Sequence, residues 1–259
     1  MKSTFIERKK FILEQLEAKS LVDTAEIAGI LRVSKETLRK DLAALEKEGL
    51  LTRTHGGAVK AENNTPLFER TVYRKNLYTE EKASICKKAA SLIQSGDTIF
   101  IDCSTTSFSL LKYIDPGKNV TVLTNSIQVV MENEEYLHPN ITLIMIGGIF
   151  QKDFYSFGGE FASDMLNNFL PNKTFISAMS LGEDGVLYDA NMHNIDVKRY
   201  FINNSDKVIL LIDHSKIGVR GGVQLSPISS VDTVVVDSHV SDSKLETLKS
   251  LVDHVVISE

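Results

Sequence analysis

The sequence has only two cysteines among its 259 residues, Cys86 and Cys103, and they do not form a C-x-x-C pair. That arrangement suggests neither a metal site nor a disulfide scaffold, so we expect two reduced thiols and no cofactor. The first residues, MKSTFIERKKF, lack the apolar core of a signal peptide. The longest apolar run, near residues 141–150, is far short of the ~20 residues that span a bilayer. These absences predict a cytoplasmic protein with no membrane partner.

The sequence also has little positive charge, and its net charge of −5 by itself argues against a nucleic-acid partner. The charge is unevenly distributed, however. Residues 1–60 contain 12 Lys and Arg against 9 Asp and Glu, a net +3, whereas the rest contains 17 against 25, a net −8. A small basic unit is therefore joined to an acidic one. The polar residues 61–78, which include Pro66, are expected to link residues 1–60 to residues 79–259.

Residues 27–59 have the pattern of two helices around a tight turn, followed by a hairpin. Ser34 is expected to cap the second helix, and Leu38, Leu42 and Leu45 repeat at i, i+4 and i+7 as its buried stripe. Positive and hydroxyl side chains near the start of this helix lie away from that stripe. Helix-turn-helix proteins place their base-reading side chains there, with the helix N-terminus in the major groove. The predicted DNA contacts on this helix are Ser34, Lys35, Thr37, Arg39 and Lys40.

One further helix and a wing complete this unit. Apolar side chains predict a first helix over residues 5–18, and the capping box Asp23-x-x-Glu26 predicts the start of the next. Residues 50–59, LLTRTHGGAV, are expected to form a two-stranded wing with a glycine pair at its turn. Arg53 and His55 on this wing would donate hydrogen bonds to phosphate or to a groove.

The alternative interpretation is a surface helix pair with solvated charges, which helical periodicity alone would favour. The sequence instead keeps the acids Glu46 and Glu48 at the far end of the helix and adds the wing as a second cationic element. The segment VSKETLRKDLAALEKEGLLTRTHGGAV, together with Arg8-x3-Ile12-x3-Leu16, resembles the winged helix-turn-helix of the DeoR family of bacterial transcription regulators. This resemblance implies a double-stranded DNA operator as the partner.

From residue 79 the sequence alternates between helices and short apolar strands. Predicted strands cover residues 98–102, 120–123, 141–146, 173–179, 208–213, 234–237 and 254–257. Predicted helices cover residues 79–93, 194–203 and 244–251, with others through Leu110 and after Ser126. Such alternation indicates a parallel-rich sheet that is covered on both faces. The predicted fold class is therefore a small winged helix-turn-helix domain followed by an α/β sensor domain with a parallel-rich sheet.

Polar side chains recur where these predicted strands end, and ligands of open α/β sheets bind in the crevice beyond those ends. Loops there supply hydroxyls, amides and backbone N–H groups that suit a phosphate or a sugar. One such loop is more often a helix cap, but four together indicate a small anionic or polyhydroxylated ligand. The predicted effector contacts are Asp102, Ser104, Thr105, Thr106, Asn125, Ser126, Gly147, Gly148, Asp189 and Lys216.

The segments GDTIFIDCSTTS, TVLTNS, MIGGIF and LIDHSKIG resemble the effector domain of the DeoR family, which is similar in fold to ribose-phosphate isomerases. The resemblance implies a phosphorylated sugar as the effector, and it adds Lys82 as a second positive charge in the site. The family's loop D-x-G-T-T differs here, since Ser104 stands in place of the glycine. The similarity also leaves an alternative open, a sugar-phosphate isomerase or transferase with an accessory N-terminal domain.

An isomerase would need a carboxylate base and a group that stabilises the enediolate. Lys216 could be the electrophile, and the candidate bases are Asp102, Asp184, Asp189 and Asp196. The same acids could instead bind sugar hydroxyls or cap helices. His193 and His214 are isolated in the sequence and lack the spacing of nucleophile partners or metal ligands. We therefore expect recognition without turnover.

The predicted function is that of a sequence-specific transcription regulator, most simply a repressor of a sugar or sugar-alcohol utilisation operon that a phosphorylated sugar releases. One winged unit reads only a short half-site, and symmetric pairing raises specificity. We therefore also predict a homo-oligomer, a dimer or larger.

Overall fold

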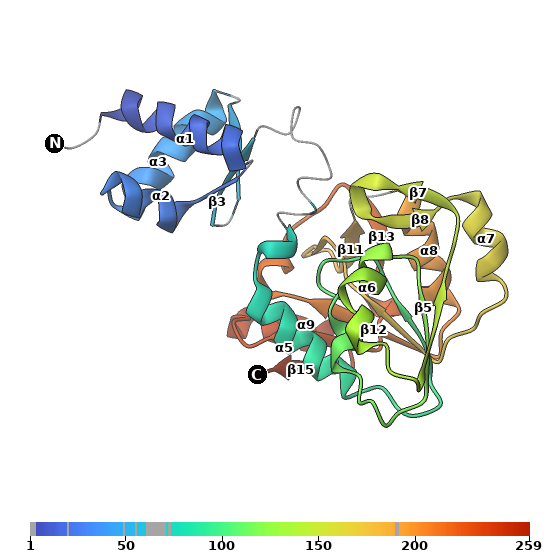
Figure 1. Cartoon of the computed structure of the whole chain (residues 1–259). Helices are drawn as coiled ribbons and strands as arrows, with labels where there is room; N and C mark the ends of the chain where they lie inside the picture. The colour runs from blue at the N-terminus through green and yellow to red at the C-terminus, as the bar shows by residue number, and fades with distance from the viewer. Residues whose placement is uncertain are drawn as a thin grey trace. The chain divides into compact units, whose positions relative to one another are not determined.

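The structure is a computed structural model that describes residues 4–19, 21–48, 50–54, 56–60, 71, 74–189 and 192–259. The chain divides into two compact units, Met1–Arg74 and Lys75–Glu259 (Figure 1). Most of the predicted linker, residues 61–78, lies outside the described residues. Within them, no helix is both long enough and apolar enough to span a bilayer.

The described residues up to 60 form three helices and a three-stranded antiparallel sheet. Its elements are α1 (Phe5–Lys19), β1 (Leu21–Asp23), α2 (Thr24–Leu31), α3 (Lys35–Lys47), β2 (Leu51–Arg53) and β3 (Gly57–Lys60). The strand order is β1-β3-β2. Val59 of the central strand β3 pairs with Leu21 of β1 on one side and with Thr52 of β2 on the other. The predicted two-stranded wing is confirmed as the β2–β3 hairpin, and the short strand β1 before α2, which was not predicted, pairs with it as a third strand.

Two side-chain caps start the helices of this unit, as the sequence predicts. The Asp23 carboxylate accepts the Ala25 and Glu26 N–H groups at 2.7 and 2.8 Å, and the Ser34 hydroxyl accepts the Thr37 N–H at 3.1 Å. The leucine stripe of α3 is confirmed as buried core. An ion pair between Arg8 on α1 and Asp41 on α3, with N–O distances of 2.5 and 2.9 Å, joins the first helix to the third.

The glycine pair of the wing has a second role besides the predicted turn. A Cβ at Gly57 would lie 1.8 Å from the Val22 carbonyl oxygen, so only glycine lets β3 approach β1 this closely. The Gly56 carbonyl accepts the Thr24 N–H at 2.7 Å, at the start of α2. The Thr54 N–H closes the turn by donating to the Gly57 carbonyl at 3.0 Å. The pair therefore attaches the wing to β1 and α2 as well as turning it.

The second unit is built around a parallel sheet, to which seven of the described strands belong. Its order is β15-β14-β12-β9-β4-β5-β6, and every neighbouring pair is parallel. The strands are β4 (Thr98–Ile101), β5 (Val120–Thr124), β6 (Ile141–Met145), β9 (Lys173–Ile176), β12 (Lys207–Ile212), β14 (Thr233–Asp237) and β15 (His254–Ser258). The prediction of a covered, parallel-rich sheet is confirmed.

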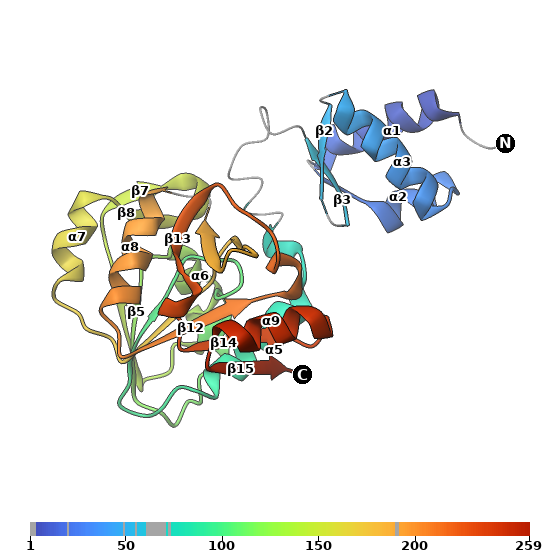
Figure 2. The ribbon, with the colours of Figure 1, turned by 180° about the vertical axis from the view of Figure 1, so that it is seen from behind.

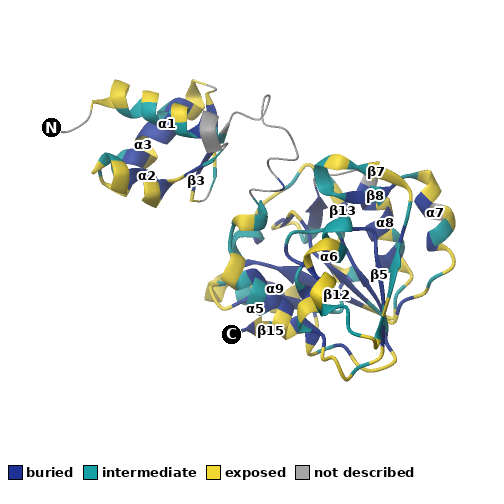
Figure 3. Ribbon diagram, in the orientation of Figure 1, coloured by how far each residue is buried: buried dark blue, intermediate teal, exposed yellow. Residues whose placement is uncertain are grey.

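Helices cover both faces of this sheet, because alternate side chains of each strand point to opposite sides. Ile99 and Ile101 pack in one buried cluster with α5 (Thr79–Ala90) and the 3-10 helix η1 (Leu110–Tyr113). Phe100 packs in the other with α7 (Glu160–Leu166), α8 (Met192–Asn203) and α9 (Asp242–Leu251), and it stacks on Phe201 at 4.0 Å. Figure 2 shows α9 beside β15, and Figure 3 shows the strands as buried.

Several elements of the second unit differ from the sequence prediction. Two antiparallel additions were not predicted, the hairpin β7 (Ile149–Gln151)–β8 (Ser156–Gly158) and the sheet β10 (Ser180–Leu181)–β11 (Val186–Asp189)–β13 (Val223–Pro227). The α-helix predicted through Leu110 is a turn and a 3-10 helix, because the Ser107 hydroxyl bonds back to Asp102. The remaining short elements are α6 (Ile127–Glu132), η2 (Glu134–Tyr136), η3 (Lys152–Phe154), η4 (His214–Lys216) and η5 (Ile228–Ser230).

Candidate DNA-binding surface and effector site

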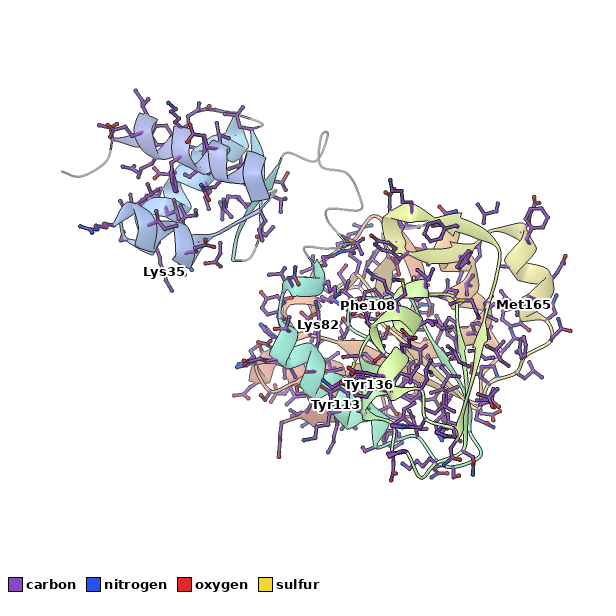
Figure 4. All side chains as sticks on the ribbon, in the orientation of Figure 1. Lys35, Lys82, Phe108, Tyr113, Tyr136 and Met165 are labelled. Atoms are coloured by element: carbon purple, nitrogen blue, oxygen red, sulfur yellow. The ribbon has the colours of Figure 1, made fainter. Side chains whose placement is uncertain are left out.

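The start of α3 carries the predicted DNA contacts on the surface of the first unit. Lys35, Arg39 and Lys40 are exposed, and none of them forms an ion pair with a described carboxylate. Figure 4 shows Lys35 at the edge of the unit. The Ser34 and Thr37 hydroxyls lie 2.8 Å apart, so both contribute to the helix cap. Three cations and a helix N-terminus therefore face solvent together.

The wing residue Arg53 lies beside α3 and is 43% exposed in its side chain. Its guanidinium is 4.0 Å from the Glu46 carboxylate, and its backbone N–H donates to Glu46 at 2.8 Å. Glu46 therefore contacts the wing, although the sequence suggested that the acids of this helix are remote from the cations. His55 lies outside the described residues.

In the second unit, the carboxylate of Asp102 is the centre of a buried polar network. One oxygen accepts the Ser107 hydroxyl at 2.5 Å and the Ser104 N–H at 3.2 Å. The other accepts the Ser177 N–H at 3.0 Å and lies 2.9 Å from the Lys198 ammonium. Burial raises the pKa of this carboxyl, but Lys198 and the hydrogen bonds outweigh it and hold the pKa below its usual value. Asp102 therefore acts as a fixed negative charge.

Lys198 on α8 is a residue that the sequence prediction missed. Its ammonium lies 2.6 Å from Asp189 and 2.9 Å from Asp102, and the residue is only 5% exposed. The two carboxylates outweigh burial and raise its pKa above the usual value. A signal was available, because Lys198 follows Ile195 by three residues and precedes Phe201 by three, on the apolar stripe of its helix.

Lys216, a predicted effector contact, follows strand β12 and lies in the same polar region. Its ammonium donates to the Thr106 hydroxyl at 2.8 Å and to the Ser177 hydroxyl at 3.3 Å. It also lies 3.3 Å from a carboxylate oxygen of Asp213, and its side chain is 18% exposed. Strand β9 lies between β4 and β12, so the loops after these three strands meet. We call Thr106, Ser177, Asp189, Lys198 and Lys216 the effector cluster.

Asp213 and Lys82 are two further charged residues near this cluster. Burial raises the pKa of the Asp213 carboxyl, but Lys216, the Ser215 hydroxyl and Lys82 together hold it below its usual value. Lys82 is buried on α5, where Figure 4 labels it.

The loop after β4 presents the remaining predicted phosphate contacts. Ser104 and Thr105 are half-buried, and the Ser104 hydroxyl accepts the Ser107 N–H at 3.2 Å. Among the described residues, no acceptor bonds the backbone N–H groups of Thr105 and Thr106. This loop therefore carries two N–H donors next to each other, and Lys216 from the segment after β12 reaches the Thr106 hydroxyl, an arrangement that suits an anion.

Other predicted effector residues contact the β7–β8 hairpin. The Asn125 amide donates to the Phe157 carbonyl at 2.8 Å, and Ser126 bridges to Ser156. Ser126 also caps α6 through the Val129 N–H at 3.4 Å. A Cβ at Gly148 would lie 2.7 Å from the Gly158 carbonyl, and Gly148 has a φ of +140°. The neighbouring Gly147 donates its N–H to the Met165 sulfur at 3.5 Å. These contacts position the hairpin.

The remaining candidates for chemistry have varied surroundings. Asp196 is exposed on α8, and Asp184 accepts the Tyr188 hydroxyl at 2.6 Å. Both cysteines are free, and desolvation raises the pKa of each thiol to about 12. His214 is not isolated, because its Nδ1 lies 2.8 Å from Asp237. The side chain of His193 is outside the description.

A helix-turn-helix with exposed cations on its second helix, followed by an α/β unit with a polar cluster at the carboxyl edge of its sheet, defines a transcription regulator with a sensor domain. The chain belongs to the DeoR family. The family model for a DeoR-like helix-turn-helix domain matches residues 8–64, and the model for the DeoR C terminal sensor domain matches residues 78–238.

Named relatives are similar to the chain over almost its whole length. The lactose phosphotransferase system repressor of Lactococcus lactis is 32% identical and is aligned over 92% of this chain and 93% of its own. The glycerol-3-phosphate regulon repressor of Escherichia coli is 32% identical over 96% of both chains. The regulator GolR of Listeria innocua is 30% identical over 91% of both.

Among solved structures, ribose 5-phosphate isomerase A of Methanocaldococcus jannaschii aligns with 54% of this chain and 54% of its own. The sequence identity is 16% and the TM-score is 0.40.

Proposed function

We propose that this regulator represses a sugar or sugar-alcohol utilisation operon and that a phosphorylated sugar releases it from its operator. The observation that carries this proposal is the effector cluster, where Lys216 and two backbone N–H donors meet a carboxylate–lysine pair at one edge of the sheet. The names of two relatives, repressors of a lactose phosphotransferase system and of a glycerol-3-phosphate regulon, support the same class of effector.

Each part of the cluster suits one part of such a ligand. A phosphate would accept hydrogen bonds from Lys216, from the Thr105 hydroxyl and from the loop N–H groups of Thr105 and Thr106. The bond from Lys216 would be the strongest, since it is charge-assisted. Asp189 and the Ser177 hydroxyl would bond sugar hydroxyls. Asp102 and Lys198 are bonded on every side, so they hold the geometry of the cluster.

Release requires that the effector distinguishes two states of the protein. A ligand shifts DNA affinity only by the difference between its affinities for those states. A coupling of ~1–3 kcal/mol, the usual range, corresponds to roughly 5- to 150-fold weaker operator binding. We expect an effect in that range.

The proposal includes recognition without turnover. An isomerase base must accept a proton near neutral pH, whereas Asp102 is fully buried, bonded at both oxygens and has a lowered pKa. The carboxylate of Asp189 is paired with Lys198. If NMR shows that the protein converts an added sugar phosphate to another compound, this part of the proposal is contradicted.

The test is operator affinity with and without effector. A thermal-shift screen of phosphorylated sugars first identifies ligands that stabilise the protein, because a ligand that binds only the folded state raises its stability. Fluorescence anisotropy with labelled operator then measures release. Lys216→Ala should bind operator like the parent but fail to respond, and Thr105→Ala should respond more weakly than the parent.

The matched control is Lys207→Ala, an exposed lysine on β12 whose partner is Asp232. It should respond like the parent protein. If Lys216→Ala is released as readily as the parent, the effector site is elsewhere.

We also propose that the regulator acts as a homo-oligomer, because a single winged unit reads too short a half-site for high specificity. Light scattering at micromolar concentration should give a dimer or a larger species, with and without operator. A monomeric mass in both conditions would contradict this.

A further inference from the structure

Two histidines and a carboxylate meet beside the effector cluster, although they are distant in the sequence. Strands β12 and β14 are parallel neighbours, so the loops that follow them lie at the same edge of the sheet. His214 follows β12, and Asp237 and His239 lie at the end of β14. One donor atom from each of the three side chains lies within 4.8 Å of the other two.

We propose that His214, Asp237 and His239 bind a divalent metal ion of the zinc type. Zinc binds histidine nitrogen and carboxylate oxygen at 2.0–2.2 Å in tetrahedral geometry, so its donor atoms lie about 3.3 Å apart. Here Asp237 Oδ1 lies 2.8 Å from His214 Nδ1 and 3.5 Å from His239 Nδ1. These separations are close to those that the ion requires.

The type of donor selects the class of ion. Two imidazoles and one carboxylate suit Zn²⁺, Co²⁺ or Ni²⁺, whereas Ca²⁺ and Mg²⁺ prefer sites made of oxygen alone. Glu81, in the first turn of α5, places a carboxylate oxygen 3.5 Å from His239 Nδ1. It is therefore the candidate for a fourth ligand, with water as the alternative.

Surrounding groups already orient two of the three ligands. The Asp237 carboxylate accepts the backbone N–H of His214 at 2.7 Å and that of His239 at 2.9 Å, and its side chain is 2% exposed. The Tyr78 ring packs edge-on against the His214 ring at 5.2 Å. Groups that fix the orientation of ligands in this way raise the metal affinity of a site.

The arrangement also leaves a route for the ion. The His239 side chain is 67% exposed, so one face of the cluster opens to solvent. An ion bound at Nδ1 would replace the contact between His214 Nδ1 and Asp237 Oδ1. Since His214 begins the 3-10 helix that ends at Lys216, the ion would tie that helix to the end of β14.

The simpler alternative is that Asp237 only orients His214 through a hydrogen bond. That alternative explains the 2.8 Å contact but predicts no role for the exposed imidazole of His239. The test is therefore made on His239, whose exposure allows substitution without loss of packing.

The experiment titrates the full-length protein, freed of metal with a chelator, with ZnCl₂ in a calorimeter and with CoCl₂ by visible absorption. We expect one equivalent per chain, and His239→Ala should weaken binding at least ~10-fold. Glu81→Gln should weaken it less. His254→Ala, which removes an exposed histidine at the start of β15, is the matched control and should bind like the parent.

Several results would overturn the proposal. These are dissociation constants weaker than ~1 mM, unchanged binding in His239→Ala, or an equal loss in His254→Ala. A cobalt spectrum with thiolate charge-transfer bands would place the ion on a cysteine and would also overturn it. Far-UV circular dichroism shows that each variant is folded before the titration.

Discussion

The cations of α3 and Lys198 of the sensor unit lie in opposite surroundings. Lys35, Arg39 and Lys40 are exposed, and the described carboxylates form no ion pairs with them. Lys198 is buried between Asp102 and Asp189 instead. An exposed cation keeps its hydration and exchanges it for a phosphate when DNA approaches. A buried cation is compatible with a stable fold only when acids beside it compensate its charge, so the stability of the fold depends on that pairing.

This difference predicts which property of the protein each substitution should change. Removing an exposed cation should change the affinity for a partner and leave the fold unchanged. Removing a buried one should change the free energy of unfolding first. The predictions below test that separation.

The largest expected effect is that of Lys198→Met. Removing one partner of a buried ion pair costs ~3–5 kcal/mol, and here it leaves two buried carboxylates without their cation. Urea unfolding, followed by circular dichroism, should show this loss in the sensor unit. Lys207→Met, at an exposed ion pair with Asp232, should change little because solvent screens that pair. Equal effects of the two substitutions would remove the contrast between buried and exposed lysines.

Gly57→Ala extends the comparison to the backbone of the DNA-binding unit. Its Cβ would lie 1.8 Å from the Val22 carbonyl oxygen, so the wing must move away from β1. Overpacking of this kind costs ~1–3 kcal/mol. Gly56→Ala is the matched control, because its Cβ meets only an Asp23 oxygen at 3.8 Å. Thermal unfolding should give a lower melting temperature for Gly57→Ala than for Gly56→Ala. Equal melting temperatures would contradict the close approach of β3 to β1.

Arg39→Ala combined with Lys40→Ala should weaken operator binding without lowering the melting temperature. A lost base contact typically costs ~1–3 kcal/mol. A gel-shift series at several salt concentrations measures the effect, since phosphate contacts also change the salt dependence. Lys47→Ala, at the other end of α3, is the control. Unchanged affinity in the double variant, or an equal loss in the control, would disprove this placement of the DNA surface.

A pH profile should give the smallest effect and tests Asp102. Its folded-state pKa is lowered, so its contribution to stability is present above the unfolded pKa of about 3.9 and is lost as pH falls through the lower folded value. Each unit between the two pKa values is worth ~1.4 kcal/mol. The difference in melting temperature between the parent and Asp102→Asn should therefore narrow below about pH 4. A constant difference in melting temperature would show that Asp102 is not the titrating group. The control is Asp196→Asn, at an exposed residue, whose melting temperature should equal that of the parent at each pH.

The sequence predicted those features that depend on local pattern. Alternating apolar side chains marked the strands of the parallel sheet, and Asp23 and Ser34 marked two helix starts. The exposed cations of α3 could be found in the same way, because a helical stripe of leucines defines which residues face away from it. Each of these features is decided by residues within one or two turns of each other.

The buried network could not be predicted in the same way, because it depends on which strands are neighbours. Asp102 contacts Ser177 only because β4 lies beside β9. His214 and His239 meet only because β12 lies beside β14. The lysine on the apolar stripe of α8 was a visible sign, but its partners were not. The strand order, which sets these contacts, has no local signature in the sequence.

The position of β9 in the middle of the parallel sheet has a consequence for how the chain folds. Ile99 of β4 pairs with Lys173 of β9, 74 positions later. The chain between β4 and β9 must be closed into a long loop before these two strands gain any contact with each other, and this makes folding slow. On the ribosome, β4, β5 and β6 are synthesised before the strand that must lie next to β4, so this edge stays open during synthesis. The DNA-binding unit has no such delay, because the residues that form its core are complete by Ala58.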